Sequence, residues 1–297
     1  SLLCLGVVAL VAVELAPMPY PQRPADIPLW YHQLGQEPGD FSILELPEQD
    51  DYWHGAYRMY FQTAHGKRIF GGYISREFPH PFLRSTPGYQ ELMYADGAGD
   101  MFKSGPDVWF SALAQYKTRY IVLQKDRLPD KDEPPVDVTA SREAVSRLLA
   151  GAAPSYSDEQ LEAYRVPPPE HTVPFLSVGE GWQPRELGPN GAFRWMGDRA
   201  TLRVDAPRSE QAYLVFRATA IEPRTMQVFH GGTRVLEQQI GGLQEFKVGP
   251  LGVPAGVSTI TFVSPEGSVS PKQLGMGNDP RHLSFSVLEA RLEPVSK

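Results

Sequence analysis

The sequence predicts an α+β, multidomain protein: part of a transmembrane helix, then a small α/β module, then a C-terminal antiparallel β-sandwich. Three observations predict this. The first residues are almost wholly apolar, helical and strand-like patterns alternate through the first half, and only short strand-like segments remain in the second half. We therefore expect a partial transmembrane helix at residues 1–17, a small α/β module at 18–170 and a β-sandwich at 171–297.

The N-terminal segment is apolar from Ser1 to Ala16 except for Ser1 and Glu14. As a helix it would span roughly 24 Å, slightly less than the ~30 Å hydrocarbon core of a bilayer. A signal peptide would carry a basic region, which this segment lacks, and a buried core helix is the other alternative. Pro17 and the prolines after it end the helix. We expect a transmembrane helix that lacks its first residues and anchors an extracytoplasmic chain in the cell membrane.

The α/β module is predicted from alternating patterns between residues 38 and 170. Short apolar runs predict buried strands at Phe41–Pro47 and Thr118–Asp126. Aromatic residues at near-helical spacing predict a helix from Tyr52 that ends at His65-Gly66, because glycine commonly follows a helix C-terminus. The remaining expected elements are a helix at 106–116, a helix at 141–149 with Ser141 as N-cap, a hairpin at 155–166 and a stiff linker at 166–170.

The sandwich is predicted from segments in which apolar and polar residues alternate with a period of two. Turn sequences rich in glycine, proline and asparagine separate these segments, and this spacing is typical of antiparallel β-sandwiches. The expected strands lie at 200–206, 211–220, 224–235, 245–253, 258–265 and 283–293.

Charge and motif content exclude several classes of function. The net charge of −7, with no run of Lys and Arg, opposes nucleic acid as a partner. Cys4 is the only cysteine, so an internal disulfide and a Cys-based zinc site are excluded. The seven histidines form no metal-binding spacing, and no nucleotide-binding or nucleophile-elbow motif is present. We therefore expect no metal, no cofactor and no catalytic residue in this chain.

Two groups of residues are candidates for glycan binding. The first comprises His65, Lys67, Tyr73 and Arg76, where mixed donors beside glycines suit a sugar or phosphate group. The alternative is a tight turn whose polar groups are satisfied internally.

The second group lies in the sandwich, where exposed tryptophans would pack on sugar rings while charged groups meet the hydroxyls. The alternative is that Trp195 fills the core and that Asp279 pairs with Arg281 or caps a turn. The candidates are Trp182, Arg194, Trp195, Asp279 and Arg281.

The order of motifs resembles the C-terminal extracytoplasmic region of large bacterial polytopic membrane proteins of the GT-C glycosyltransferase-like type. The residues that carry the resemblance span nearly the whole chain. The most specific are Gln62-Thr63-Ala64-His65-Gly66-Lys67, Gly71-Gly72-Tyr73 and Asp279-Pro280-Arg281.

The resemblance implies a role without catalysis. In such transferases the catalytic acidic residue and the lipid-linked sugar site lie among membrane helices upstream, so this chain would be an accessory part that binds or positions a glycan acceptor. Whether this chain is an enzyme by itself stays open. The alternatives are a membrane-anchored structural surface protein that contacts other proteins and a secreted glycoside hydrolase with an appended binding module.

Overall fold

The computed structural model describes residues 26–47, 52–72, 81–94, 96–125 and 137–295, with a few single positions nearer the N-terminus. Within these ranges no helix is both long and apolar enough to cross a membrane. Most of the transmembrane helix predicted at residues 1–17 lies outside the described residues, as do the candidates Tyr73 and Arg76.

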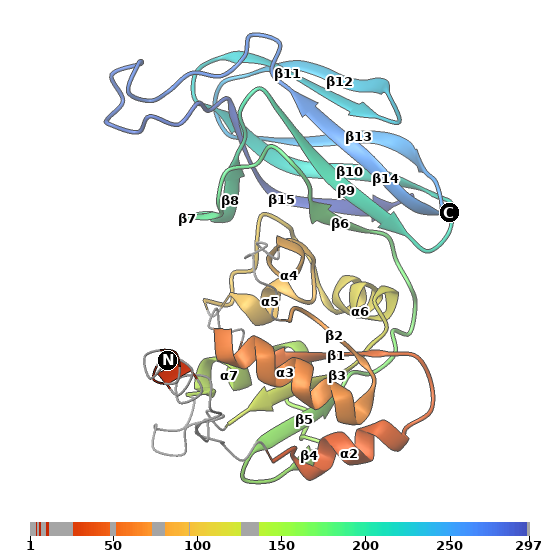
Figure 1. The fold of residues 1–297 in the computed structure, drawn as a ribbon. Coiled ribbons are helices and arrows are strands. Elements are labelled where there is room, and N and C mark those ends of the chain that lie inside the picture. The colour runs from red at the N-terminus through yellow and green to blue at the C-terminus, as the bar shows by residue number, and fades with distance from the viewer. Residues whose placement is uncertain are drawn as a thin grey trace.

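The α/β module is built on a five-stranded mixed sheet with strand order β2-β1-β3-β5-β4 (Figure 1). Strands β2, β1 and β3 run parallel, whereas β5 and β4 are antiparallel additions. The bounds are β1 (Ser42–Leu46), β2 (Arg68–Ile69), β3 (Thr118–Gln124), β4 (Tyr156–Ser157) and β5 (Leu161–Arg165). The predicted strands and the predicted hairpin are therefore present.

Helices cover both faces of this sheet because β1 and β3 are apolar on both sides. Helices α2 (Leu29–Gln36) and α3 (Tyr52–His65) pack over Ile43 and Val122. Helices on the opposite face pack over Leu44 and Ile121. The elements on that side are α4 (Pro81–Ser85), α5 (Gln90–Met93), α6 (Pro106–Gln115) and α7 (Thr139–Leu148).

The predicted start of α7 is wrong. The helix begins at Thr139 with Val138 as the N-cap, so Ser141 lies inside its first turn. The Asp137 carboxylate accepts a hydrogen bond from the Thr139 N–H at 2.9 Å, which satisfies one of the free donors at the helix start. The capping carboxylate therefore lies four residues earlier than the serine favoured by sequence.

The C-terminal part is a sandwich of two five-stranded antiparallel sheets. The first sheet has the order β13-β10-β15-β8-β7 and the second sheet the order β12-β11-β14-β9-β6. The first sheet consists of β7 (Glu186–Gly188), β8 (Gly191–Trp195), β10 (Glu210–Ala220), β13 (Gln244–Val253) and β15 (Phe285–Pro294). The second sheet consists of β6 (Phe175–Val178), β9 (Arg199–Ala206), β11 (Arg224–His230), β12 (Thr233–Ile240) and β14 (Gly256–Val263).

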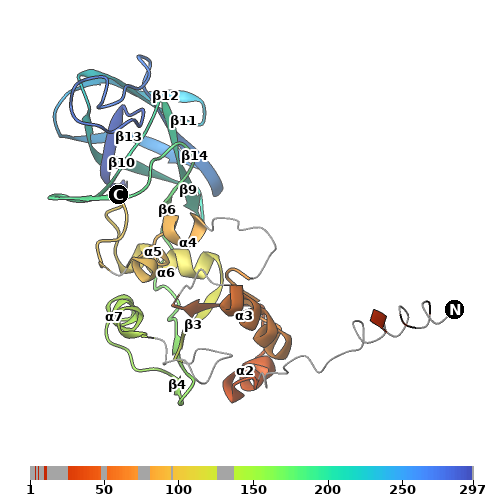
Figure 2. The same cartoon turned by 60° about the vertical axis from the view of Figure 1, so that its left-hand side comes forward.

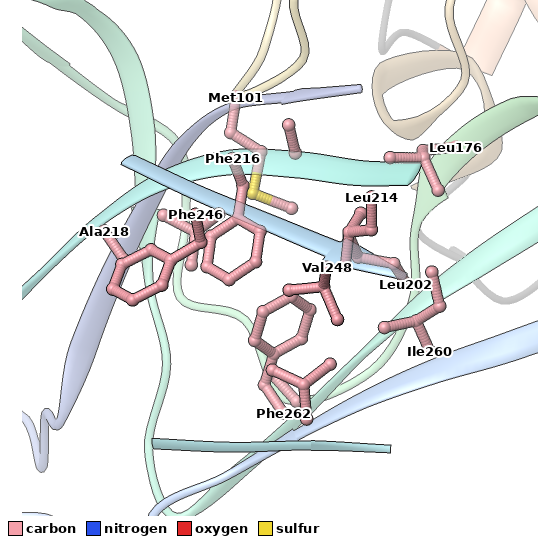
Figure 3. Packing of buried hydrophobic residues seen from close by; sticks show 14 of the residues in the cluster. Met101, Leu176, Leu202, Leu214, Phe216, Ala218, Phe246, Val248, Ile260 and Phe262 are labelled. Carbon is pink, nitrogen blue, oxygen red and sulfur yellow. The ribbon is translucent and has the colours of Figure 1, made fainter. Parts of the chain in front are cut away.

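The antiparallel β-sandwich is confirmed, and five of the predicted segments each correspond to one strand. The segment predicted at 224–235 is instead a hairpin, in which the Gly231-Gly232 turn separates β11 from the start of β12. The core of the sandwich contains a group of aromatic rings, in which Phe216 lies 5.0 Å from Phe246 and 5.3 Å from Phe262 (Figure 3). Strands β6, β7 and β8 were not predicted, since they are short and precede the first clear alternating run.

The module and the sandwich share a junction, with α4, α5 and α6 beneath the sandwich in both views (Figures 1 and 2). Met101 from the α/β side belongs to the sandwich core cluster (Figure 3). A parallel bridge pairs Phe102 with Ala290, whose N–H donates to the Met101 carbonyl at 2.8 Å. Backbone pairing and shared apolar packing therefore hold the two parts together.

Candidate functional site

The outer face of the second sheet carries a hollow of about 610 Å³. It lies over the end of β11, the turn that follows, the start of β9 and the second half of β14. The β11–β12 hairpin is on the side of the sandwich away from the α/β module (Figure 1). The lining residues are Arg199, Phe229, Gly231, Gly232, Ser258, Thr259, Thr261 and Val263.

Strand register brings these side chains together. Met226 and Val228 are fully buried in the core, so Phe229 lies on the outer face by the alternation of a strand. Phe229 pairs with Thr261 of β14, and Arg199 of β9 pairs with Val263. Directly opposite residues of an antiparallel pair point to the same face. The hollow therefore combines residues of three strands.

A glycine turn forms one rim of the hollow. Gly231 and Gly232 have φ values of 57° and 81°, and both central residues of a two-residue type I′ turn need positive φ. They join His230 to its strand partner Thr233. A Cβ at either glycine would meet nothing within 4 Å, and the Phe229 ring is half-buried beside the turn.

Hydrogen-bond donors and hydrogen-bond acceptors both surround the Phe229 ring in the hollow. Arg199 is exposed, and its guanidinium makes no hydrogen bond or ion pair with any described residue. Ser258 and Thr259 supply hydroxyls that donate and accept. His230 Nε2 lies 3.5 Å from the Ser258 hydroxyl, and burial lowers the pKa of His230. This combination suits a polar, neutral ligand with an apolar face.

Two of the candidates in the sandwich, Asp279 and Arg281, bind each other beside strand β7 at the edge of the first sheet. Arg281 donates to both Asp279 oxygens and, at 2.7 Å, to Glu186. Glu186 pairs with Phe193, whose ring lies 6.4 Å from Trp195. The Arg281 guanidinium thus already binds two carboxylates of this chain, while Trp195 lies on the neighbouring strand β8. The pairing of Asp279 with Arg281 is the alternative considered from the sequence.

The two other candidates of the sandwich have internal partners. The Trp182 Nε1–H donates to the Thr201 carbonyl at 2.7 Å, and the ring packs 5.7 Å from Phe262. Arg194 binds Asp100 through charged hydrogen bonds of 2.6 to 2.9 Å. The structure thus places Trp182 at the core edge and Arg194 at the junction between the two parts.

In the first group of candidates, His65 and Lys67 also form hydrogen bonds within the chain. His65 is only 3% exposed, and its Nδ1 accepts a hydrogen bond from the Lys67 N–H at 2.9 Å. Burial lowers the pKa of His65 to about 4, so the ring is neutral near pH 7. The Lys67 ammonium donates to the carbonyls of Glu37 and Gly39. The contacts of Lys67 and of His65 Nδ1 match the alternative of a turn satisfied within the chain, whereas the buried His65 Nε2 has no hydrogen-bond partner among the described residues.

Sequence reasoning missed Arg199, Phe229 and the hydroxyls of β14. One signal was available: Phe229 follows Val228, so an apolar residue stands at a position that alternation assigns to the outer face. No group of three or more His, Cys, Asp or Glu in the described ranges is arranged to hold a metal ion.

Comparison with known proteins gives structural similarity alone. No family model matches the chain, and no curated protein matches its sequence. A Podospora anserina GH26-CBM35 β-(1,4)-mannanase is 14% identical, with a TM-score of 0.30; the match covers 42% of this chain and 28% of that one. The C-terminal CBM6 of a marine laminarinase from Zobellia galactanivorans is 12% identical, with a TM-score of 0.27, over 40% of this chain and 98% of that one.

A third similar structure is a carbohydrate-binding module of Cellvibrio mixtus lichenase 5A in complex with cellotriose. It is 11% identical, with a TM-score of 0.25, and the match covers 39% of this chain and 89% of that one. The function of this chain has to be argued from its own geometry.

Proposed function

We propose that the β-sandwich binds a carbohydrate chain in the hollow on its second sheet. One observation carries the proposal: a hollow of about 610 Å³ is lined by the half-buried Phe229 ring, by several hydroxyls and by the Arg199 guanidinium, which has no partner among the described residues. This volume lies within the range of small-ligand sites, which is roughly 300–1,000 Å³. The C–H face of a sugar packs on an aromatic ring while its hydroxyls exchange hydrogen bonds with neighbouring polar groups.

The lining favours sugar over other ligand classes. The lining is mostly apolar but contains the hydroxyls of Ser258, Thr259 and Thr261, which a lipid chain would cover without offering them hydrogen bonds. A net charge of −7 opposes a nucleic acid. Glycan binding uses the hydroxyls, the ring and the guanidinium together.

The binding test is titration calorimetry of the whole chain with neutral trisaccharides and a peptidoglycan disaccharide. Phe229→Ala should weaken binding at least tenfold, and Arg199→Gln should weaken it severalfold, because each removes a group that lines the hollow. Trp195→Ala is the matched control, since it removes a half-exposed aromatic residue from the first sheet. Loss of binding with Trp195→Ala but not with Phe229→Ala would move the site to the cluster around Arg281, and absence of heat with every glycan would reject the proposal.

We further propose that the chain is the non-catalytic, extracytoplasmic part of a glycosyltransferase-like membrane protein and positions a glycan acceptor. This setting is supported by the sequence resemblance alone. Protease treatment of intact cells that express the parent protein tests it. Cleavage within the sandwich from outside the cell is expected, and protection until the cells are lysed would contradict it.

A further inference from the structure

A smaller cavity, of about 90 Å³, lies at the junction between the α/β module and the sandwich. Phe102 and Val108 line it from the module, where Val108 belongs to α6. Phe175 of β6 and Leu292 of β15 line it from the sandwich. In both ribbon views α6 lies beneath β6 at this junction (Figures 1 and 2). The wall of the cavity is therefore mostly hydrocarbon and comes from both parts of the chain.

Several polar groups of this wall are already bonded within the chain. The Ser104 hydroxyl donates to Glu91 Oε1 at 3.1 Å and accepts from the Trp109 Nε1–H at 2.9 Å. The backbone N–H and carbonyl of Ala290 are paired as well. A sugar or another neutral polar ligand would find these groups occupied. It would lose hydrogen bonds to water without replacing them.

Lys103 supplies the charge that remains at this cavity. It is exposed, and its ammonium has neither a hydrogen bond nor an ion pair with another residue of the described ranges. Arg291 also lines the cavity, but the Glu293 carboxylate holds its guanidinium at 2.8 Å. Among the described residues that line the cavity, none is acidic. A ligand here should therefore carry a negative charge.

The size of the cavity and its wall narrow the class of anion. The volume equals that of about three water molecules, each of which occupies about 30 Å³ in the liquid. A short aliphatic carboxylate fits, because its hydrocarbon end suits the wall and its two oxygens suit an ammonium. Inorganic phosphate does not fit, because its oxygens point in all directions and some would face hydrocarbon without a hydrogen bond.

We propose that this cavity binds a short-chain carboxylate such as propionate or butyrate. The hydrocarbon part lies among Phe102, Phe175 and Leu292, and the carboxylate pairs with the Lys103 ammonium. Because the ligand contacts both parts of the chain, its binding stabilises their junction. The site is independent of the hollow on the second sheet, since no residue lines both.

The test is a backbone amide NMR titration of the whole chain with butyrate at constant ionic strength. Butyramide is the neutral probe of matched shape, butylammonium the cationic probe and phosphate the inorganic anion. We expect butyrate to shift the amides of Phe102, Lys103 and Leu292 saturably and to raise the thermal unfolding midpoint. Butyramide should bind about tenfold more weakly, because it lacks the charge that pairs with the ammonium. Butylammonium and phosphate should shift none of these amides.

Three variants separate the charge from the shape of the cavity. Lys103→Met keeps the hydrocarbon stem and should weaken butyrate binding about tenfold. Val108→Phe fills the cavity, keeps the charge and should abolish binding. Lys272→Met is the matched control, since it removes an exposed lysine that does not line the cavity. The proposal is overturned if butyrate shifts none of these amides, if butyramide or phosphate binds as tightly, or if binding survives in Lys103→Met or Val108→Phe.

Discussion

His65 illustrates how burial changes the meaning of a polar residue. From sequence, its position beside Gly66 and Lys67 suggested a ligand-binding donor. In the fold its ring stacks 5.4 Å from Tyr31 and its Nδ1 serves the local turn. Sequence alone could not distinguish these roles, because the distinction depends on α2 lying over α3.

The same burial predicts a pH dependence of stability. The pKa of His65 is about 4 in the folded chain and about 6.5 when unfolded, so the unfolded state binds the extra proton between these values. His65 should therefore disfavour folding as pH falls from about 6.5 to 4, by at most about 3 kcal/mol, and should have no effect above that window. Urea unfolding at a series of pH values measures the free energy of unfolding. In His65→Asn this free energy should fall less steeply with decreasing pH than in the wild type.

His32→Asn serves as the control, since His32 is exposed. Identical pH dependence in the wild type and in His65→Asn would contradict a neutral, buried His65.

Gly35 shows a close approach between helices that a sequence pattern does not reveal. A Cβ at this position would lie 2.7 Å from the Ala64 carbonyl oxygen on α3. Gly35→Ala should lower stability by about 1–3 kcal/mol, although alanine normally favours a helix. Thermal unfolding measures the effect. Gly252→Ala, where nothing lies within 4 Å, is the control, and a stabilised Gly35→Ala would contradict the packing.

Among the elements, long alternating strands were predictable and short ones were not. Strand β10, with 11 residues, carries enough alternation to be recognised, whereas β7 has only 3 residues. Short strands are defined by their partners: β7 exists because Glu186 pairs with Phe193 on β8. The alternation principle therefore gives strand existence but not the edges of each sheet.

The junction between elements of the two parts carries a specific stability prediction. The Asp100 side chain is 0% exposed and pairs with Arg194, so Asp100→Asn leaves a buried guanidinium without its charge partner. We expect a loss of about 3–5 kcal/mol. Asp40→Asn breaks exposed pairs with Arg68 and Lys117 and should cost much less. Calorimetric unfolding compares them, and equal small losses would contradict a structural role for Arg194.

For the whole molecule, the order of parts followed from local patterns, but the candidate sites did not. The hollow needs Arg199, Phe229 and Thr261, which meet only because β9, β14 and β11 are neighbours in the second sheet. Likewise, Asp100 and Arg194 are 94 residues apart in the chain. Such contacts depend on strand order, which single-sequence patterns leave undetermined.

The most direct test of the central claim, glycan binding in the hollow, is a map of backbone amide NMR shifts during titration with an oligosaccharide. Neutral trisaccharides are the first probes. The largest shifts are expected at Phe229, Gly231, Gly232 and Thr259, which line the hollow. Shifts confined to Phe193 and Trp195, or no shifts at all, would contradict the claim.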